Sequence, residues 1–461
     1  MTNVGENSVM RQTPDQGRTR FWSLADQGAV SLGNFLTNIL LARSLSPTDY
    51  GVFALIYGML ILMNSYHSSA VVYPLSLSGA PSTIEELHQH LRRSICATLI
   101  LAFPLGLVVF GATLVLKRPE ITPWVVLALV CWQVQETLRR GLMAHLRHAE
   151  AVWGDTLSYL GQAGMIWIYL KSQHQSLAAI FGILAATSMM ATAVQISQLS
   201  LRLAWEKDLL SQLKHSWRVS RWAVLANTAV AVPGVAYPWF LALQGTYLAA
   251  SYQALLNIIG VCNPVMMSVG NIVLPETVRA NASGGWKHAS RVLLRGGILG
   301  ATLLIPCYAL IFLWPGLFLR ILYRADSPYF FLPGALRILV VAYCFAYGAY
   351  LLSALFYGLG QSKIVFRAQS VGAVVAITCG FPLVMRFGIS GACVGMVCVY
   401  AAQLIVAAVL LRKMGTRESV LTAQIVSARE VGSRHEQVNN STVWNRPRKG
   451  KSQNENVRTI E

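Results

Sequence analysis

The chain has 461 residues, of which 54% are hydrophobic and only 12% are charged. A soluble domain carries about 25% charged residues, so this composition excludes an ordinary water-soluble protein. The formal net charge of +18 would suggest nucleic-acid binding in a soluble chain. Here the lysines and arginines lie between long apolar stretches and in the C-terminal tail, where they set membrane topology, and we expect no nucleic-acid partner.

Apolar stretches long enough to cross a hydrocarbon core of about 30 Å follow one another along the chain. They predict an all-α membrane protein with about twelve transmembrane helices. The predicted spans cover residues 21–42, 50–76, 94–116, 122–143, 154–170, 177–201, 217–243, 250–274, 292–318, 329–358, 364–386 and 389–411.

The basic residues between these spans are divided unevenly between the two sides of the membrane. The side that holds both termini carries most of them, whereas the other side has few, among them Arg43 and Arg337. The positive-inside rule therefore places both termini in the cytoplasm. Residues 1–20 form a predicted cytosolic N-terminal segment. Residues 412–461 are rich in Ser, Asn, Arg and Gln without a sustained apolar period, which predicts a disordered cytosolic tail.

A basic linker at residues 202–216 divides the spans into two six-helix bundles, residues 21–201 and 217–411. The apolar run after Tyr50 ends at Pro74, and the run after Tyr247 ends at Pro275, so the two halves resemble each other faintly. Repeated halves of this kind are typical of alternating-access transporters. Within the seventh span, Pro233-Gly234 should weaken the hydrogen-bond ladder of the helix and permit a bend, which we interpret as a hinge for a rocking motion.

The segment Leu40-Leu41-Ala42-Arg43-Ser44-Leu45-Ser46-Pro47-Thr48-Asp49-Tyr50-Gly51-Val52-Phe53-Ala54 joins the first two spans and resembles the linker of Wzx-type polysaccharide biosynthesis flippases. These belong to the multidrug/oligosaccharidyl-lipid/polysaccharide (MOP) exporter superfamily, which also includes lipid II flippases and MATE exporters. The Gly358–Lys363 loop and the two halves fit the same pattern, so the resemblance covers residues 20–412.

The resemblance implies a MATE/MOP-like fold in a bacterial inner membrane, without enzymatic activity. It also implies a transporter that moves a polyprenyl-diphosphate-linked oligosaccharide between leaflets for exopolysaccharide or O-antigen-type synthesis. The expected partners are the lipid-linked oligosaccharide, membrane lipids and the polysaccharide polymerase or export machinery.

Polar residues recur on one face of the first span, because Gln27, Ser31, Asn34 and Asn38 are spaced at helical intervals. A polar stripe in a membrane helix faces protein or water, so these side chains either line a substrate cavity or form bonds between helices. A looser stripe in the eighth span contains Asn257 and Asn271. We include all six residues as candidates for the cavity lining.

Ionisable residues within spans are candidates for function because their burial is costly. Asp26, His67 and Glu136 are the candidates for coupling transport to H⁺ or Na⁺; no other cofactor and no metal are predicted. Glu136 and Arg140 are four residues apart on one helix, which favours a structural ion pair.

Four arginines are candidates for binding the diphosphate, because a guanidinium fork matches phosphate oxygens. An equally good explanation for the two on the sparsely charged side is that they reach the lipid headgroups. Aromatic residues such as Tyr237, Trp239, Tyr343, Tyr347 and Tyr350 could stack on sugars or simply pack. The diphosphate candidates are Arg43, Arg139, Arg140 and Arg337.

The alternative function is a MATE-like, ion-coupled exporter of small cationic compounds, which would carry buried carboxylates in its cavity. A membrane-bound glycosyltransferase or polymerase is disfavoured because no long extramembrane loop and no DxD, HExxH, GxSxG or Walker A motif occurs.

Overall fold

The computed structural model describes residues 16–79, 82–145, 147–172, 175–202, 204, 209–323 and 327–443. These residues are almost entirely helical and contain no strand. Most of the predicted N-terminal segment and the last part of the predicted tail lie outside them. The chain divides into two units, Met1–Ala407 and Ala408–Glu461, and every helix except the end of α15 belongs to the first unit.

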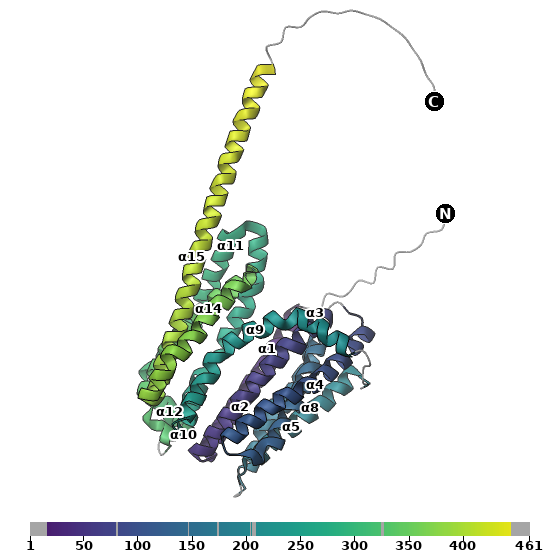
Figure 1. The fold of residues 1–461 in the computed structure, drawn as a ribbon, viewed down its shortest axis with the longest axis vertical. Helices are drawn as coiled ribbons and strands as arrows, with labels where there is room; N and C mark the ends of the chain where they lie inside the picture. The colour runs from purple at the N-terminus through teal and green to yellow at the C-terminus, as the bar shows by residue number, and fades with distance from the viewer. Residues whose placement is uncertain are drawn as a thin grey trace, which may run out of the picture. The chain divides into compact units, whose positions relative to one another are not determined.

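The first half of the chain forms a bundle in which the helices lie side by side (Figure 1). Two of the predicted spans, the second and the fifth, are each interrupted by a short π-helical segment. The elements are α1 (Gln16–Ser44), α2 (Pro47–His67), η1 (Ser68–Val72), α3 (Tyr73–Gly79), α4 (Ile84–Val115), η2 (Pro119–Ile121), α5 (Thr122–Ala144), α6 (His148–Asp155), η3 (Thr156–Leu160), α7 (Gly161–Tyr169) and α8 (Leu177–Leu199).

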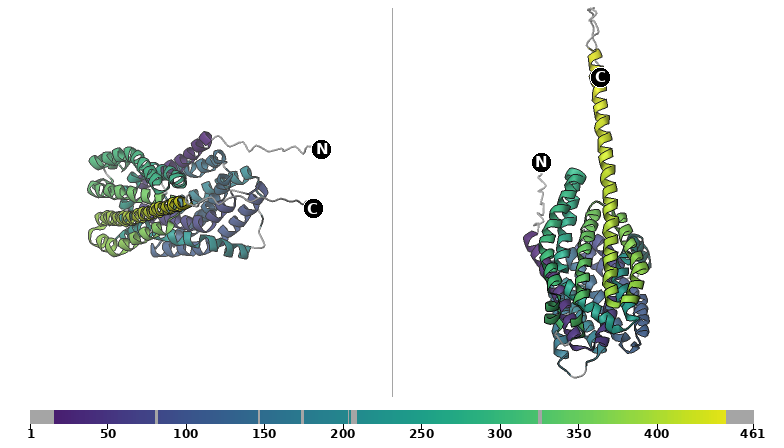
Figure 2. Two further views of the ribbon diagram at one scale, coloured as in Figure 1. Left: turned by 90° about the horizontal axis from the view of Figure 1, so that it is seen from above. Right: turned by 90° about the vertical axis from the view of Figure 1, so that its left-hand side faces the viewer.

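The second half begins with α9, which contacts α2 and η1 of the first half as well as α10 and α14. Two further views show how its helices pack (Figure 2). The elements are α9 (Leu209–Ala242), α10 (Thr246–Gly260), α11 (Asn263–Leu313), α12 (Pro315–Tyr323), η4 (Pro328–Phe331), α13 (Pro333–Gly358), α14 (Ser362–Val375), η5 (Ala376–Gly380) and α15 (Phe381–Val443).

The helices start where the sequence provides caps. The Ser46 side chain accepts a hydrogen bond from the backbone N–H of Asp49 at 3.1 Å, and Pro47 occupies the first turn of α2. At α4, Thr83 and Glu86 form a reciprocal capping box. Such caps satisfy backbone N–H groups that have no partner within the helix, so they fix where each span begins.

Two long helical runs contain glycines at which the backbone leaves the helical conformation. Gly285 in α11 has φ of 62°, and Gly388 in α15 has φ of 54°, values that residues with a Cβ rarely adopt. Gly296 lies against Val273 across the first turn, and Gly372 lies against Gln403 across the second. Both runs therefore fold back as helical hairpins, at the breaks predicted between residues 274 and 292 and between 386 and 389.

Seven helical segments among the described residues are long and apolar enough to cross a membrane. The pair Thr246–Gly260 and Asn263–Val269, bent by 52°, passes the same test jointly. The chain is thus a multi-pass membrane protein, and the exact number of twelve spans stays a prediction.

The hydrophobic core is shared between the two halves at one end of the bundle. One cluster of buried side chains joins Tyr50 and Phe53 of α2 to Tyr252 of α10, Tyr323 of α12 and Leu336 of α13. A separate cluster around Leu91 and Leu142 belongs to the first half alone, and another around Val273 belongs to the second half. The two separate clusters lie toward the helix ends opposite Tyr50.

The structure continues α15 as a helix to Val443, and the predicted disorder of residues 412–461 stays a prediction. The stretch after Arg412 lacks proline up to that point and contains Ala, Leu, Gln, Glu and Arg, which favour helix. The lack of an apolar period excludes burial of one face, but it does not exclude a helix.

Candidate functional site

A cluster of ionised side chains lies inside the first half, around Arg139 of α5. Its guanidinium is 2.5 Å from Asp26 Oδ2 of α1 and 3.0 Å from Glu136 Oε2 on the same helix, and Nε also contacts Asp155 of α6. All four side chains are at least 90% buried. Because each carboxylate comes within ion-pair distance of the same guanidinium, the cluster joins three helices through one cation.

Arg140 of α5 extends the cluster to a more accessible position. Its Nε donates to Glu136 at 2.6 Å, whereas its side chain is 42% exposed. Its two terminal nitrogens make no bond to any described residue. The predicted Glu136–Arg140 pair is therefore present, and it leaves most of the Arg140 fork available to a ligand. Three carboxylates facing two guanidinium groups leave one formal negative charge in the cluster.

Asp155 was not among the sequence-derived candidates. It lies two residues into a predicted span, where an acidic residue normally reaches water. In the structure it ends α6 directly before the π-helical segment η3 and is fully buried. A π-helical segment places an extra residue in the turn and often occurs at functional sites. Two sequence features could have indicated this position: the acidic residue itself and the preceding Gly154, which packs against Gln195 in the structure.

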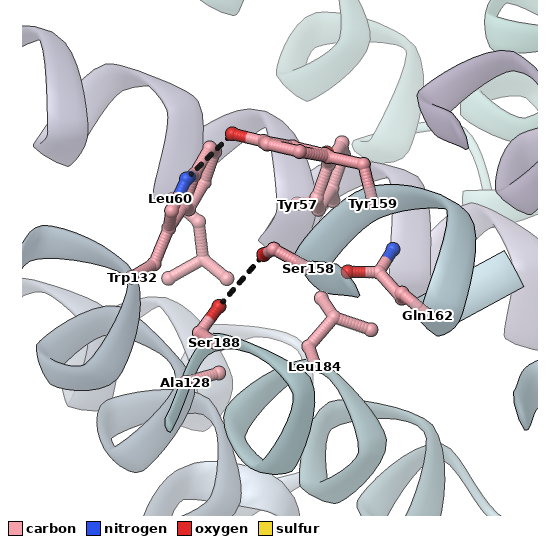
Figure 3. A pocket seen from close by; sticks show the side chains of 9 residues that line it. All are labelled: Tyr57, Leu60, Ala128, Trp132, Ser158, Tyr159, Gln162, Leu184 and Ser188. Carbon is pink, nitrogen blue, oxygen red and sulfur yellow. Dashed lines mark hydrogen bonds between the residues drawn. The ribbon is translucent and has the colours of Figure 1, made fainter. Parts of the chain in front are cut away.

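Hydrogen bonds connect Asp155 to a small polar cavity in the same bundle. Gln135 donates to Asp155 Oδ1 at 3.4 Å and accepts from Ser158 Oγ at 2.8 Å. Figure 3 shows the cavity, where Ser158 faces Ser188 and the Trp132 indole N–H donates to Tyr159. The cavity is about large enough for one water molecule. The cluster is therefore connected through Gln135 to a polar cavity in the same bundle.

His67 is buried at the end of α2, apart from this cluster. Its Nε2 lies 2.9 Å from Thr98 Oγ1 and 3.2 Å from Thr137 Oγ1, so it joins α2 to α4 and α5. Its Nδ1 has no partner among the described residues. The structure thus brings Asp26 and Glu136 together, but places the third coupling candidate in a separate network.

The other two arginine candidates bind carbonyl groups at helix ends. Arg43 of α1 donates to Leu322 O at 2.6 Å and to Ile321 O at 2.5 Å, in the last turn of α12. Arg337 donates to Phe312 O at 3.0 Å, at the end of α11. A cation is favoured at a helix C-terminus. Arg43 therefore ties the first half to the second, whereas Arg337 acts within the second half.

The two polar stripes meet at the end where the halves share a core. Asn257 of α10 donates to Tyr50 at 2.9 Å and to Tyr323 at 3.3 Å, and Tyr50 donates to Asn38 of α1 at 3.5 Å. One turn away, Tyr57 donates to Asn34 at 2.6 Å. Five residues at this end form what we call the latch: Asn38, Tyr50, Asn257, Tyr323 and Arg43.

The remaining stripe candidates are not part of the latch. Gln27 and Ser31 are half-buried on α1. Asn271 lies within α11, and its side chain is outside the described residues.

A larger cavity of about 430 Å³ lies within the second half. It is lined by side chains from α9, α11, α13, α14 and α15, including Tyr343 and Tyr350 from the sequence-derived aromatic set, and by Pro233 and Gly234. The described residues that line it carry no charge. Tyr237 is instead packed against Gly380 and Gly395, and Tyr347 donates to Gly297 O at 2.8 Å.

Comparison with known proteins found likeness in structure alone, since no protein-family model and no curated protein matches the sequence. The lipid II flippase MurJ in an inward closed conformation matches with a TM-score of 0.68 and 12% identity, over 85% of this chain and 87% of its own. The eukaryotic MATE transporter AtDTX14 matches with a TM-score of 0.62 and 14% identity, over 86% and 95%.

A further match is the MATE multidrug transporter DinF-BH, with a TM-score of 0.59 and 15% identity over 90% of this chain and 98% of its own. Other matching structures are described as transporters of the MOP superfamily. All of these neighbours are transporters or flippases, not enzymes. The likeness confirms the predicted fold class: the chain has the all-helical membrane fold of MOP-superfamily transporters.

Proposed function

We propose that this chain moves a polyprenyl-diphosphate-linked oligosaccharide between the leaflets of a bacterial inner membrane by alternating access. The observation that carries the proposal is the fold shared with a lipid II flippase over 85% of the chain, at a TM-score of 0.68. That neighbour's name specifies a lipid-linked substrate, and the linker after the first span independently resembles Wzx-type flippases.

The contacts between the halves support alternating access. The latch and the shared core join the halves at the end of Tyr50. Toward the opposite end each half has its own hydrophobic cluster, and α9 meets α2 there through the hydrogen bonds of Ser65 to Asn227 and of Tyr66 to Thr228. With the predicted orientation of both termini in the cytoplasm, the latched end faces away from the cytoplasm. A substrate that enters from the cytoplasmic side is then released only after the latch separates.

Arg140 is the best diphosphate ligand among the four arginine candidates. Glu136 holds its Nε at 2.6 Å, which orients the guanidinium while its terminal nitrogens remain available. A charge-assisted, two-pronged contact to phosphate oxygens follows from that geometry. Arg139 is enclosed by carboxylates, and Arg43 and Arg337 already bind carbonyl oxygens.

The surplus negative charge of the cluster supports the predicted coupling to H⁺ or Na⁺. A cation that binds near Asp26 and Asp155 would neutralise it, and its release would restore the surplus. Because the three carboxylates belong to α1, α5 and α6, such neutralisation changes the attraction between these helices.

The second candidate function is a MATE-like exporter of small cations. The buried carboxylates favour it, as does the fold shared with DinF-BH, whose name specifies a multidrug transporter. In this chain, however, two arginines pair with those carboxylates, which disfavours binding of an organic cation at the same place.

Reconstitution in liposomes separates the two functions. Two substrates would be offered to the same vesicles, a polyprenyl diphosphate that carries glucose and the cationic dye ethidium, with a proton or sodium gradient in separate samples. We expect the glycolipid to change leaflets and the dye to remain outside. Accumulation of the dye with a stationary glycolipid would overturn the proposal and establish the exporter.

A further inference from the structure

The cavity of the second half has the size of a small-molecule site but no charged lining among the described residues. Its volume of about 430 Å³ lies within the usual range of about 300–1,000 Å³ for ligand pockets. Its polar and aromatic lining comes mainly from α13, α14 and α15: Tyr343, Tyr350, Tyr357, Tyr400, Gln369 and Gln403.

Four tyrosines line the cavity. Tyr343, Tyr350 and Tyr357 recur every seven residues along α13, which places them on one face of the helix. Tyr400 of α15 meets Tyr343 edge to face, with ring centroids 5.9 Å apart. Tyr357 is 46% exposed, so the aromatic lining extends from the interior to an open mouth near the end of α13.

The two glutamines provide fixed hydrogen-bonding groups beside these tyrosines. Gln403 is 4% exposed, and its Nε2 donates to Gln369 Oε1 at 2.9 Å. It packs so closely on α14 that a Cβ at Gly372 would lie 2.2 Å from its Nε2. The pair still has the Gln403 carbonyl oxygen and the Gln369 amino group to offer, because an amide can make more bonds than this one.

We propose that this cavity is a subsite for uncharged sugar rings of the transported lipid-linked oligosaccharide, an inference that rests on the proposed function. A pyranose presents an apolar face of C–H groups to an aromatic ring and hydroxyl groups at its edge to amides. An anion would find no cation among the described residues of this lining. A hydrocarbon chain would leave the buried amides without the hydrogen bonds that offset their burial.

The substrate would therefore be recognised in two places. The diphosphate binds cationic side chains, and the sugar binds a neutral cavity built by the second half. Pro233 and Gly234 of α9 also line the cavity, so a change in the bend of α9 would alter the sugar subsite. The sugar thus contacts the helix in which the hinge was predicted.

Binding of two probes to the purified full-length protein tests the subsite. The probes are farnesyl diphosphate and the same molecule with glucose on its diphosphate. We expect glucose to tighten binding to the wild type by about tenfold or more. Gln403→Leu and Tyr400→Leu should each remove most of that increment, while the affinity for farnesyl diphosphate stays unchanged. The matched controls are Gln361→Leu and Tyr247→Leu, at exposed positions outside the cavity, which should keep the full increment.

Three other results would rule out the sugar subsite or the proposed function. An increment that is absent in the wild type, or that persists in both cavity variants, would overturn the subsite. Equal weakening of both probes by Gln403→Leu, with an unchanged melting temperature, would assign the cavity to the lipid chain and also overturn it. If neither probe binds to the wild type, the proposed function itself is wrong.

Discussion

Arg139 is the side chain on which the packing of the first half depends most strongly. Its guanidinium contacts Asp26, Glu136 and Asp155 from three helices, in an interior from which water is largely excluded. Removing one partner of a buried ion pair typically costs about 3–5 kcal/mol, because the remaining charge stays buried without compensation. Here its removal would leave Asp26 and Asp155 in that state, whereas Glu136 would keep Arg140 as a partner.

Arg139→Met should therefore lower the free energy of unfolding of the detergent-purified protein by about 3–5 kcal/mol. A markedly lower melting temperature would show this loss. Adding Asp26→Asn and Asp155→Asn to this variant should restore part of the loss, because it removes both uncompensated charges. A single Arg139→Met variant as stable as the wild type would contradict the assignment.

Part of this cluster can be predicted from the sequence. The Glu136–Arg140 contact follows from helical spacing alone, since it joins residues four apart. The Asp26–Arg139 contact joins residues 113 apart, and only the packing of α1 on the first bundle creates it. Asp155 was missed because it lies at the start of a predicted span. At such a position the sequence does not distinguish an acidic residue that reaches water from one that is buried, and the π-helical segment behind it leaves no mark in the composition.

Helices α2 and α10 belong to different halves, and a glycine allows their backbones to come very close where they cross. A Cβ at Gly51 would lie 1.9 Å from the backbone oxygen of Thr246, whereas a Cβ at Gly58 on the same helix would meet nothing within 4 Å. Backbone atoms cannot rotate away as a side chain can. The two helices would have to separate to accommodate any larger residue at Gly51.

Gly51→Ala should destabilise the protein by about 1–3 kcal/mol or more, as overpacked interiors do. Gly58→Ala is the matched control and should be neutral or slightly stabilising, since alanine favours helix over glycine. Thermal unfolding of the two variants under identical conditions measures the difference. Equal melting temperatures would show that α2 and α10 do not cross as described.

The bonds of Arg43 should hold α1 of the first half against α12 of the second half. Arg43→Ala removes two hydrogen bonds between α1 and α12, each worth about 1–3 kcal/mol for a charged donor. It should increase the fraction of molecules in which the latched end is open, as measured by distances between spin labels on the two halves.

Arg337→Ala is the control for this experiment, because it removes an arginine bond to a carbonyl within the second half alone. It should leave the distance distribution unchanged. If both variants shift the distribution alike, or neither does, the bonds of Arg43 do not hold the halves together.

The positions of the helices along the chain could be predicted from the sequence better than the contacts between them. The breaks between apolar runs coincide with the turns at Gly285 and Gly388, because a glycine with positive φ is where a helix can reverse. The three π-helical segments were not predicted, since each continues the same apolar run.

At the scale of the whole molecule, α9 connects the two halves and contains the predicted hinge. Pro233 lies inside the helix and cannot donate its backbone nitrogen to the helical ladder, and a Cβ at Gly234 would have free space. Replacement of both residues by alanine should therefore fold normally, straighten α9 and stiffen it.

We expect the Pro233→Ala/Gly234→Ala variant to flip glycolipid in liposomes more slowly than the wild type, with an unchanged melting temperature. A rate equal to that of the wild type would remove the hinge. The sequence indicated this position through its helix-breaking residues, but not that both residues line the cavity of the second half.

Under alternating access as proposed, a lipid-linked sugar changes leaflets only when the halves separate at the latch. Arg43→Cys and Ile321→Cys, in a background without the eight native cysteines, place two exposed thiols across that contact. A reducible thiol crosslinker would then join the halves in the reconstituted protein. We predict that flipping of polyprenyl-diphosphate glucose stops when the crosslink forms and resumes when it is reduced; flipping at an unchanged rate through the crosslinked protein would contradict the account.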